Sequence, residues 1–162
     1  MNTKETCYLF FDFDGTVYLG GEHIPTENLE AMRRVQAMGH KLILHTGRSY
    51  GALFRSPCVF EVPWDGMILG AAEYHYEGRV IHRESVSYNE FLVWLDYAFE
   101  HRCKLAYEGR TDCHFLDFSE ENPEALREQV LEHLPELKRV NPITKMTIFD
   151  YVLPGEAYTS QS

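Results

Sequence analysis

The amino-acid sequence predicts an α/β fold, a partial Rossmann-like parallel sheet that carries an inserted α+β segment. Two short apolar runs, residues 7–11 and 41–45, each stop at polar residues, and a helical pattern separates them. Short apolar runs bounded by turn residues are typical of buried strands. Strand, helix and strand in this order form a βαβ unit, whose strands are parallel and joined by a right-handed crossover. From residue 73 onward, hairpin signals and aromatic residues replace this pattern.

The first apolar run leads into a short acidic segment. Asp12 and Asp14 are two residues apart, so in an extended chain their side chains lie on the same face. Gly15 allows a sharp turn, and Thr16 adds a hydroxyl and a backbone N–H donor. Two carboxylates beside such donors suit Mg²⁺ together with a phosphate. A plain Asp-Gly turn explains the same residues, so this segment alone leaves both interpretations open.

The second apolar run, which ends in Thr-Gly-Arg at 46–48, favours the phosphate interpretation. Phe-Asp-Phe-Asp-Gly-Thr-Val followed along the chain by Leu-Ile-Leu-His-Thr-Gly-Arg resembles the haloacid dehalogenase-like (HAD) phosphatase superfamily, and in particular its Cof-type branch. The resemblance implies that Asp12 is the nucleophile and Asp14 the general acid/base, with Mg²⁺ held at these two residues. It assigns phosphate binding to four residues: Thr16, Thr46, Gly47 and Arg48. An ordinary ion pair is the alternative role for Arg48.

Composition restricts the classes of protein to which the chain can belong. Hydrophobic residues make up 44% and charged residues 25% of the 162 residues, which is typical of a globular protein. The formal net charge of −10 argues against a general nucleic-acid binder. No apolar run reaches the length of a membrane span, and the first residues lack a signal-peptide pattern. The four cysteines show no Cys-x-x-Cys spacing, and Cys7 lies in a predicted core strand, so we expect reduced thiols and a cytoplasmic location.

The N-terminal part is expected to hold one long helix and a third strand. Thr26 is the predicted N-cap of a helix that ends at Gly39. Residues 49–55 suit a short helix, and residues 66–70 a third core strand. In the family, an Asn-Gly pair usually follows that strand, whereas this chain has Gly-Ala-Ala at 70–72. The inner side of the long helix is expected to carry four apolar residues: Leu29, Met32, Val35 and Met38.

The rest of the chain resembles the α+β lid, or cap, that Cof-type members insert after their third core strand. A hairpin at 74–76 and 79–82 is followed by a helix whose first residues, 87–90, have capping-box spacing. Its inner side is expected to carry Phe91, Trp94, Leu95 and Ala98. Strands at 104–108 and 113–118, a helix from Pro123 through residue 134, and a strand at 143–149 follow. We therefore predict a core part at 1–72, a cap domain at 73–150 and a tail at 151–162.

Two motifs of the family are not found in the sequence. Full members return to the core after the cap and add a Lys and then an acidic motif that completes the Mg²⁺ site. Lys145 and Asp150 are not expected to replace them, because both lie in or beside the last predicted cap strand. The chain resembles a C-terminally truncated member.

The missing motifs leave three functional hypotheses open. The first is a Mg²⁺-dependent phosphatase of small phosphorylated metabolites that acts through an aspartyl-phosphate, weakly or not at all as this chain. The second is a non-catalytic binding or regulatory module on the same scaffold. The third is a truncated product. An uncovered sheet edge and face would favour a homodimer in any of these cases.

Overall fold

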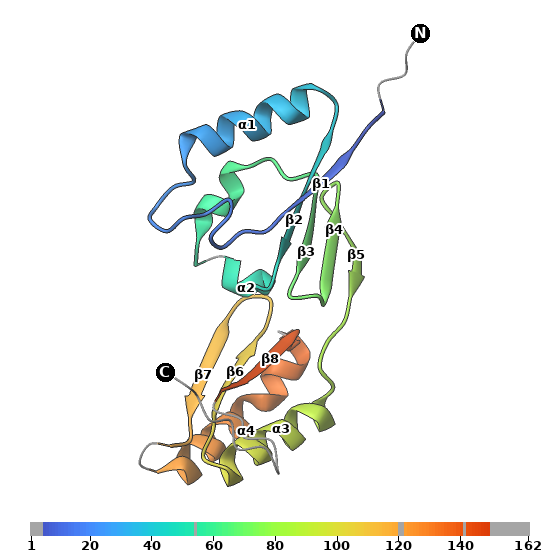
Figure 1. Ribbon diagram of the computed structural model, residues 1–162. Coiled ribbons are helices and arrows are strands. Elements are labelled where there is room, and N and C mark those ends of the chain that lie inside the picture. The colour runs from blue at the N-terminus through green and yellow to red at the C-terminus, as the bar shows by residue number, and fades with distance from the viewer. Residues whose placement is uncertain (1–4, 54, 120–121, 141, 150–162) are drawn as a thin grey trace, which may run out of the picture.

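The computed structural model describes residues 5–53, 55–119, 122–140 and 142–149, and it has two lobes (Figure 1). We call residues 5–83 the N-terminal lobe and residues 84–149 the C-terminal lobe. The N-terminal lobe contains a five-stranded sheet in the order β1-β2-β3-β4-β5, and the C-terminal lobe a three-stranded sheet in the order β7-β6-β8. The strands of the first sheet are β1 (Tyr8–Phe11), β2 (Lys41–Thr46), β3 (Gly66–Leu69), β4 (Glu73–Tyr76) and β5 (Arg79–Arg83). Those of the second are β6 (Lys104–Glu108), β7 (Cys113–Asp117) and β8 (Lys145–Phe149).

The helices of the N-terminal lobe pack on one face of its sheet. They are α1 (Thr26–Ala37), the short α2 (Tyr50–Leu53) and a 3₁₀ turn, η1 (Pro57–Glu61). The N-cap of α1 is Pro25 and no side chain caps the helix, so the prediction that Thr26 caps it is wrong by one residue. Met32 is buried as expected, but Met38 is 51% exposed because it lies beyond the last helical turn, which ends at Ala37.

The first strand is an edge strand, and the prediction that it is buried is wrong. β1 pairs in parallel with β2, and β2 pairs in parallel with β3, which confirms the βαβ unit. Within the described residues nothing pairs with the other side of β1. Phe11 packs against the helix-side core, whereas Tyr8 and Phe10 are 54% and 60% exposed. Cys7, expected in the core, is exposed as well.

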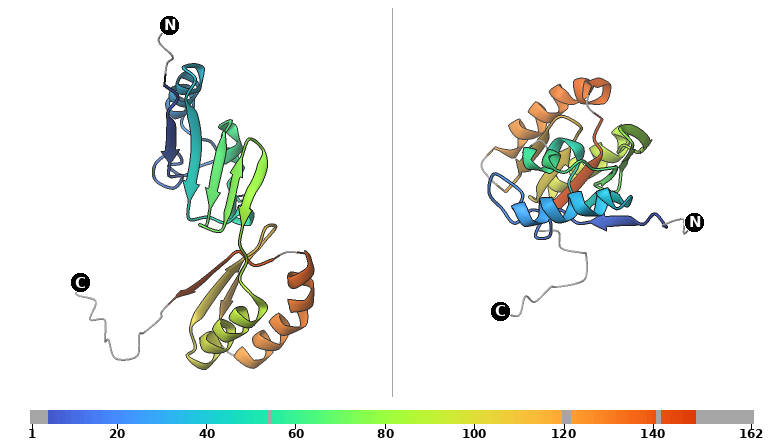
Figure 2. Two further views of the ribbon diagram at one scale, coloured as in Figure 1. Left: turned by 90° about the vertical axis from the view of Figure 1, so that its right-hand side faces the viewer. Right: turned by 90° about the horizontal axis from the view of Figure 1, so that it is seen from above.

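The predicted hairpin forms, but it belongs to the first sheet. β4 pairs antiparallel with β3 and with β5, so the sheet continues through the boundary that the sequence suggested at residue 72. The three residues between β3 and β4 are too few for a crossover, and an antiparallel return beside β3 is the arrangement that they allow. In the structure, the chain leaves the first sheet only after β5, as Figure 2 shows.

The C-terminal lobe has its own core beneath two helices, α3 (Tyr88–Glu100) and α4 (Pro123–Val140). Ser87 and Glu90 form the predicted capping box at the start of α3. Phe91 and Leu95 are buried, but Trp94 is 43% exposed because it lies at the rim of the apolar face of α3. α4 extends beyond its predicted end at residue 134.

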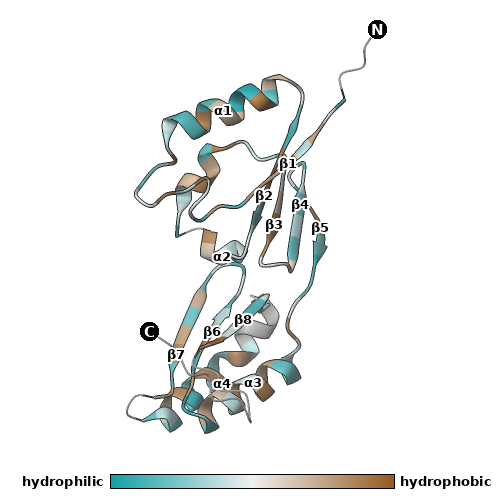
Figure 3. Ribbon diagram, viewed as in Figure 1, coloured by the Kyte–Doolittle hydropathy of each residue, from teal (hydrophilic) through white to brown (hydrophobic). Residues whose placement is uncertain are grey.

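The two lobes touch where the turn between β6 and β7 meets α2. A Cβ added at Gly51 would lie 2.6 Å from the Gly109 carbonyl oxygen, so only glycine fits this contact. Apolar residues concentrate on inner elements such as β3 (Figure 3). Within the described residues, no helix combines the length and the apolar character that a membrane span requires.

Candidate active site

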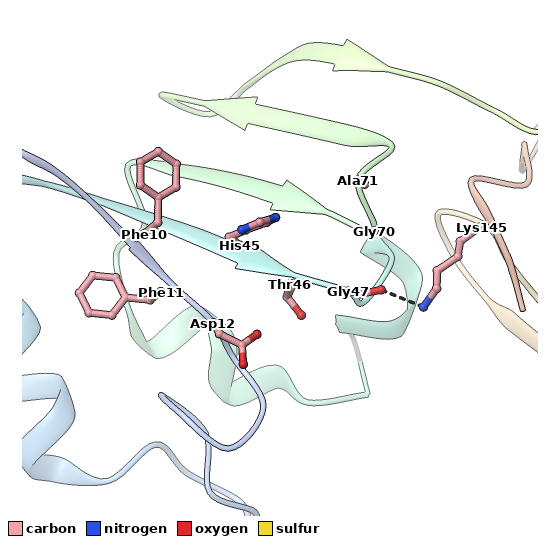
Figure 4. Close-up of a pocket in the computed structure, with 9 residues that line it drawn as sticks. All are labelled: Phe10, Phe11, Asp12, His45, Thr46, Gly47, Gly70, Ala71 and Lys145. Atoms are coloured by element: carbon pink, nitrogen blue, oxygen red, sulfur yellow. Dashed lines mark hydrogen bonds between the residues drawn. The ribbon is translucent and has the colours of Figure 1, made fainter.

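The carboxyl ends of β1, β2 and β3 meet at one edge of the N-terminal sheet. Because these strands are parallel, the residues that follow them lie together, and ligands of open α/β sheets bind at such an edge. A pocket of about 440 Å³ opens there. Its lining is drawn in Figure 4 and consists of Phe10, Phe11, Asp12, His45, Thr46, Gly47, Gly70, Ala71 and Lys145.

Asp12 and Thr46 bring a carboxylate and a hydroxyl to the same pocket (Figure 4). Thr46 is the last residue of β2 and is 4% exposed. Its Oγ1 accepts a hydrogen bond from the Arg48 backbone N–H at 3.2 Å, which fixes the start of the Thr-Gly-Arg loop. Asp12 directly follows β1 and is exposed. The parallel pairing of β1 and β2 thus brings Thr46 to the acidic segment.

Asp14 lies outside the lining of this pocket, because Arg48 holds its carboxylate. The Arg48 Nε–H and Nη2–H groups donate to the two Asp14 oxygens at 2.8 and 2.6 Å, a bidentate geometry that fixes both side chains. The Arg48 Nη1–H group donates to Ser56 Oγ at 2.7 Å. The guanidinium also lies over the rings of Phe13 and Tyr18, at 5.3 and 5.9 Å from their centroids. Arg48 therefore makes the ion pair that was its alternative role.

The turn after Asp14 is tight and places Thr16 away from the pocket lining. Gly15 adopts a positive φ of 76°, as its place in a sharp turn requires. The Tyr18 N–H donates to the Phe13 carbonyl at 2.8 Å, which closes the loop around Thr16. Of the four residues assigned to phosphate binding, Thr46 and Gly47 line the pocket, whereas Thr16 and Arg48 are not among its lining residues.

Lys145 enters the pocket from the other lobe, a contact that the sequence analysis did not anticipate. Its Nζ–H group donates to the Gly47 carbonyl oxygen at 2.8 Å, the contact drawn in Figure 4. The lysine is the first residue of β8, the last strand of the C-terminal lobe, and from there its side chain reaches the Thr-Gly-Arg loop that follows β2. No local signal marks this contact, because 98 residues separate the two partners. Asp150, the other residue considered, lies outside the described residues.

The described residues offer few ligands for a metal ion. They contain no group of three or more His, Cys, Asp or Glu side chains placed to hold one. Asp12 supplies one carboxylate, the hard oxygen donor that Mg²⁺ prefers, while the Asp14 carboxylate is engaged by Arg48. The donor chemistry fits Mg²⁺ bound through Asp12, a backbone carbonyl and water. The two histidines of the β4–β5 hairpin are not opposite each other, because His75 pairs with Val80 and His82 with Tyr74.

Solved structures of similar fold were found for this chain, whereas no curated protein matches its sequence. A hypothetical protein from Geobacillus kaustophilus matches with a TM-score of 0.64 and 17% identity, over 90% of this chain and 58% of its own. A phosphatase of the haloalkanoate superfamily from Bacteroides thetaiotaomicron matches with a TM-score of 0.58 and 22% identity, over 85% and 48%. A sugar phosphatase of subclass IIB of this superfamily gives a TM-score of 0.59 and 19% identity, over 90% and 58%.

The chain thus spans about half to three-fifths of the solved structures that it matches. At these identities the likeness concerns the fold, and it agrees with the α/β class predicted from the sequence. The family comparison is more specific. The model of the haloacid dehalogenase-like hydrolases matches residues 9–157, which include both lobes and the Asp12–Thr46 pocket. The chain belongs to the haloacid dehalogenase-like hydrolase family.

Proposed function

We propose that this chain binds small phosphorylated metabolites and hydrolyses them through an aspartyl-phosphate at Asp12. The observation that carries the proposal is the shared pocket of the Asp12 carboxylate and the Thr46 hydroxyl at the carboxyl edge of the sheet. The C-terminal lobe would serve as the cap over this pocket, since Lys145 already lines it. Matching structures that are described as phosphatases support the same reaction class.

The reaction needs two carboxyl groups in different roles. An Asp12 carboxylate oxygen attacks phosphorus, and the bond from phosphorus to the ester oxygen breaks. The Asp14 carboxyl gives its proton to the departing alkoxide. In the second step the Asp14 carboxylate takes a proton from water as the water oxygen attacks the same phosphorus, which releases inorganic phosphate and restores Asp12. Thr46 and the backbone around Gly47 hold the phosphoryl oxygens in place throughout.

Mg²⁺ is the metal that this proposal requires, and its ligands would be Asp12 and the Asp14 backbone carbonyl. When bound, the ion neutralises charge on the phosphoryl oxygens. The remaining positions would be taken by water, as is usual for Mg²⁺. A site with one protein carboxylate binds the metal weakly, so we expect turnover to depend on a high Mg²⁺ concentration. With four free thiols in the chain, we also propose a cytoplasmic location.

The ion pair between Asp14 and Arg48 supports a second candidate, a binding module without catalysis. In the observed conformation both Asp14 oxygens accept hydrogen bonds from Arg48, so the carboxyl cannot protonate a leaving group until this pair opens. Loss of one preorganised catalytic group typically costs about 10²–10³ in rate. Weak turnover would therefore indicate that the pair opens rarely, and absent turnover would leave phosphate binding as the function.

The test is hydrolysis of 4-nitrophenyl phosphate with and without Mg²⁺ by the wild type, Asp12→Asn and Asp96→Asn. Asp96→Asn is a matched control because it also removes one carboxylate. That carboxylate pairs with Arg127 between α3 and α4, outside the pocket. We expect Mg²⁺-dependent turnover that Asp12→Asn lowers by at least about a thousandfold and Asp96→Asn preserves. Turnover no higher than that of Asp12→Asn would overturn the phosphatase and favour the binding module.

A further inference from the structure

Lys145 is the one lysine or arginine among the residues that line the pocket. Its Nζ lies 2.8 Å from the Gly47 carbonyl oxygen and 3.2 Å from Glu108 Oε1. Its stem passes beside Gly70, where a Cβ would lie 3.7 Å from Lys145 Cδ. The ammonium group of this C-terminal-lobe residue therefore lies at the loop that follows β2.

The pocket needs such a charge if it is to hold a phosphate. A phosphate monoester carries up to two negative charges near neutral pH, and the Asp12 carboxylate adds another. The guanidinium of Arg48, which follows the lining residue Gly47 in the chain, donates to Asp14 and Ser56. Bringing a phosphate beside an uncompensated carboxylate is electrostatically unfavourable in a partly buried site. Lys145 is the protein cation placed to offset this repulsion.

Glu108 holds the lysine in position from within the C-terminal lobe. Glu108 and Lys145 are directly opposite each other on β6 and β8. The Glu108 side chain is 10% exposed, and its second oxygen, Oε2, accepts the Ser49 backbone N–H at 3.3 Å. The pair therefore binds the backbone on both sides of Arg48, at Gly47 and at Ser49. This double contact fixes the lysine relative to the Thr-Gly-Arg loop.

We propose that Lys145 is a phosphate-binding residue, and that its ammonium donates to a non-bridging phosphoryl oxygen held by Thr46. An ammonium has three N–H donors, and the two contacts made among the described residues leave the third for the ligand. The inference rests on the proposed function, because it concerns the same pocket. It makes the affinity of the N-terminal lobe for phosphate depend on a residue of the C-terminal lobe.

Binding of inorganic phosphate at constant Mg²⁺, measured by isothermal titration calorimetry, tests this role. Lys145→Met is expected to weaken binding by about tenfold or more, since a hydrogen bond between charged groups is lost. Lys145→Arg, which keeps the charge, should restore much of the affinity. Lys104→Met is the matched control, because Lys104 lies on the same sheet and pairs with Asp117 at 3.4 Å outside the pocket lining. Lys145→Gln replaces the methionine variant if that variant does not fold.

Thr46→Val separates failure of this inference from failure of the proposed function. If Thr46→Val weakens phosphate binding and Lys145→Met does not, the pocket binds phosphate without the lysine and the inference is wrong. If the wild type does not bind phosphate, or neither variant weakens binding, the proposed function fails and the inference fails with it. An equal loss in Lys145→Arg and Lys145→Met would also overturn the inference, because a purely structural contact does not respond to charge.

Discussion

The two sheets differ on the faces that their helices leave bare. On the C-terminal sheet, this face carries cross-strand ion pairs, Lys104–Asp117 at 3.4 Å and Glu108–Lys145 at 3.2 Å. The same face also carries the exposed rings of Phe115 and Phe149, whose centroids lie 5.7 Å apart. On the N-terminal sheet the bare face carries the exposed rings of Tyr8 and Phe10, both on the edge strand β1. Adjoining exposed rings are typical of a surface that binds another protein surface. Because the charged Lys104 and Asp117 lie beside the rings of the C-terminal face, we expect the N-terminal face to be the one that associates.

A substitution at the contact between the two lobes is expected to have the largest effect on the free energy of unfolding. In Gly51→Ala the new Cβ would meet backbone atoms of the turn between β6 and β7, which cannot move aside without displacing both strands. We expect a loss of about 1–3 kcal/mol in the free energy of unfolding, as for other overpacked sites. Each lobe contains one tryptophan, Trp64 or Trp94, so single-tryptophan variants report the unfolding of each lobe separately.

Denaturant unfolding followed by tryptophan fluorescence is the measurement for Gly51→Ala. We expect the two tryptophan signals to change together in the wild type and at separate denaturant concentrations in the variant. Ala52→Gly serves as a control for the helix propensity of α2, since it changes the same four-residue helix without adding an atom. Coincident and unshifted transitions in Gly51→Ala would show that the lobes do not depend on this contact.

Local residue patterns were enough to predict the strands, the capping box and the place of Asp12 and Thr46. Each of these features depends on residues close in sequence or on the rule that parallel strands end at one edge. The sequence could not predict which sheet β4 would join, because a hairpin pattern is the same in either lobe. It also missed the contact of Lys145 with Gly47 and the capture of Asp14 by Arg48, which arise only when distant segments meet.

Low pH is expected to have a smaller effect on the stability of the N-terminal sheet, through Asp65. This carboxylate accepts hydrogen bonds from Lys41 and the Leu42 N–H at the start of β2. Burial raises the pKa of the Asp65 carboxyl, but hydrogen bonds from Lys41, the Leu42 N–H and Gln36 outweigh it, so the pKa lies below its ordinary value. A lowered pKa means that the stabilisation is complete above the unfolded value, near 4, and is lost as the pH falls through the folded value. The C-terminal lobe does not contain this carboxylate.

The measurement for Asp65 is the free energy of unfolding of the wild type and Asp65→Asn as a function of pH. At pH 7 we expect the variant to be less stable by about 1 kcal/mol, because the amide accepts weaker hydrogen bonds than the carboxylate. The difference should stay constant down to about pH 5 and shrink below pH 4. A difference that is the same at pH 3 and pH 7 would show that the charge of Asp65 does not contribute.

A substitution on the bare face of the N-terminal sheet should have the smallest effect on folding but a clear effect on the formation of a homodimer. The Cys7 carbonyl accepts the Lys41 N–H, so by strand alternation the N–H and C=O groups of Tyr8 and Phe10 point away from β2. A second copy can pair with this short apolar edge and cover the rings, and this is our proposal for a homodimer. Tyr8→Glu places a like charge opposite its own copy across such an interface and leaves the core intact.

Light scattering coupled to size-exclusion chromatography measures this effect. We expect Tyr8→Glu to raise the dimer dissociation constant by about tenfold or more, because two charges would be buried per dimer. Phe115→Glu is the matched control: Phe115 is 59% exposed and lies next to Phe149 on the bare face of the C-terminal sheet. Dissociation by Tyr8→Glu alone would assign the contact to the N-terminal face. Equal effects of both variants would remove the distinction between the two faces, because the exposed rings of both would then contribute to association. A wild type that is monomeric at high concentration would overturn the homodimer.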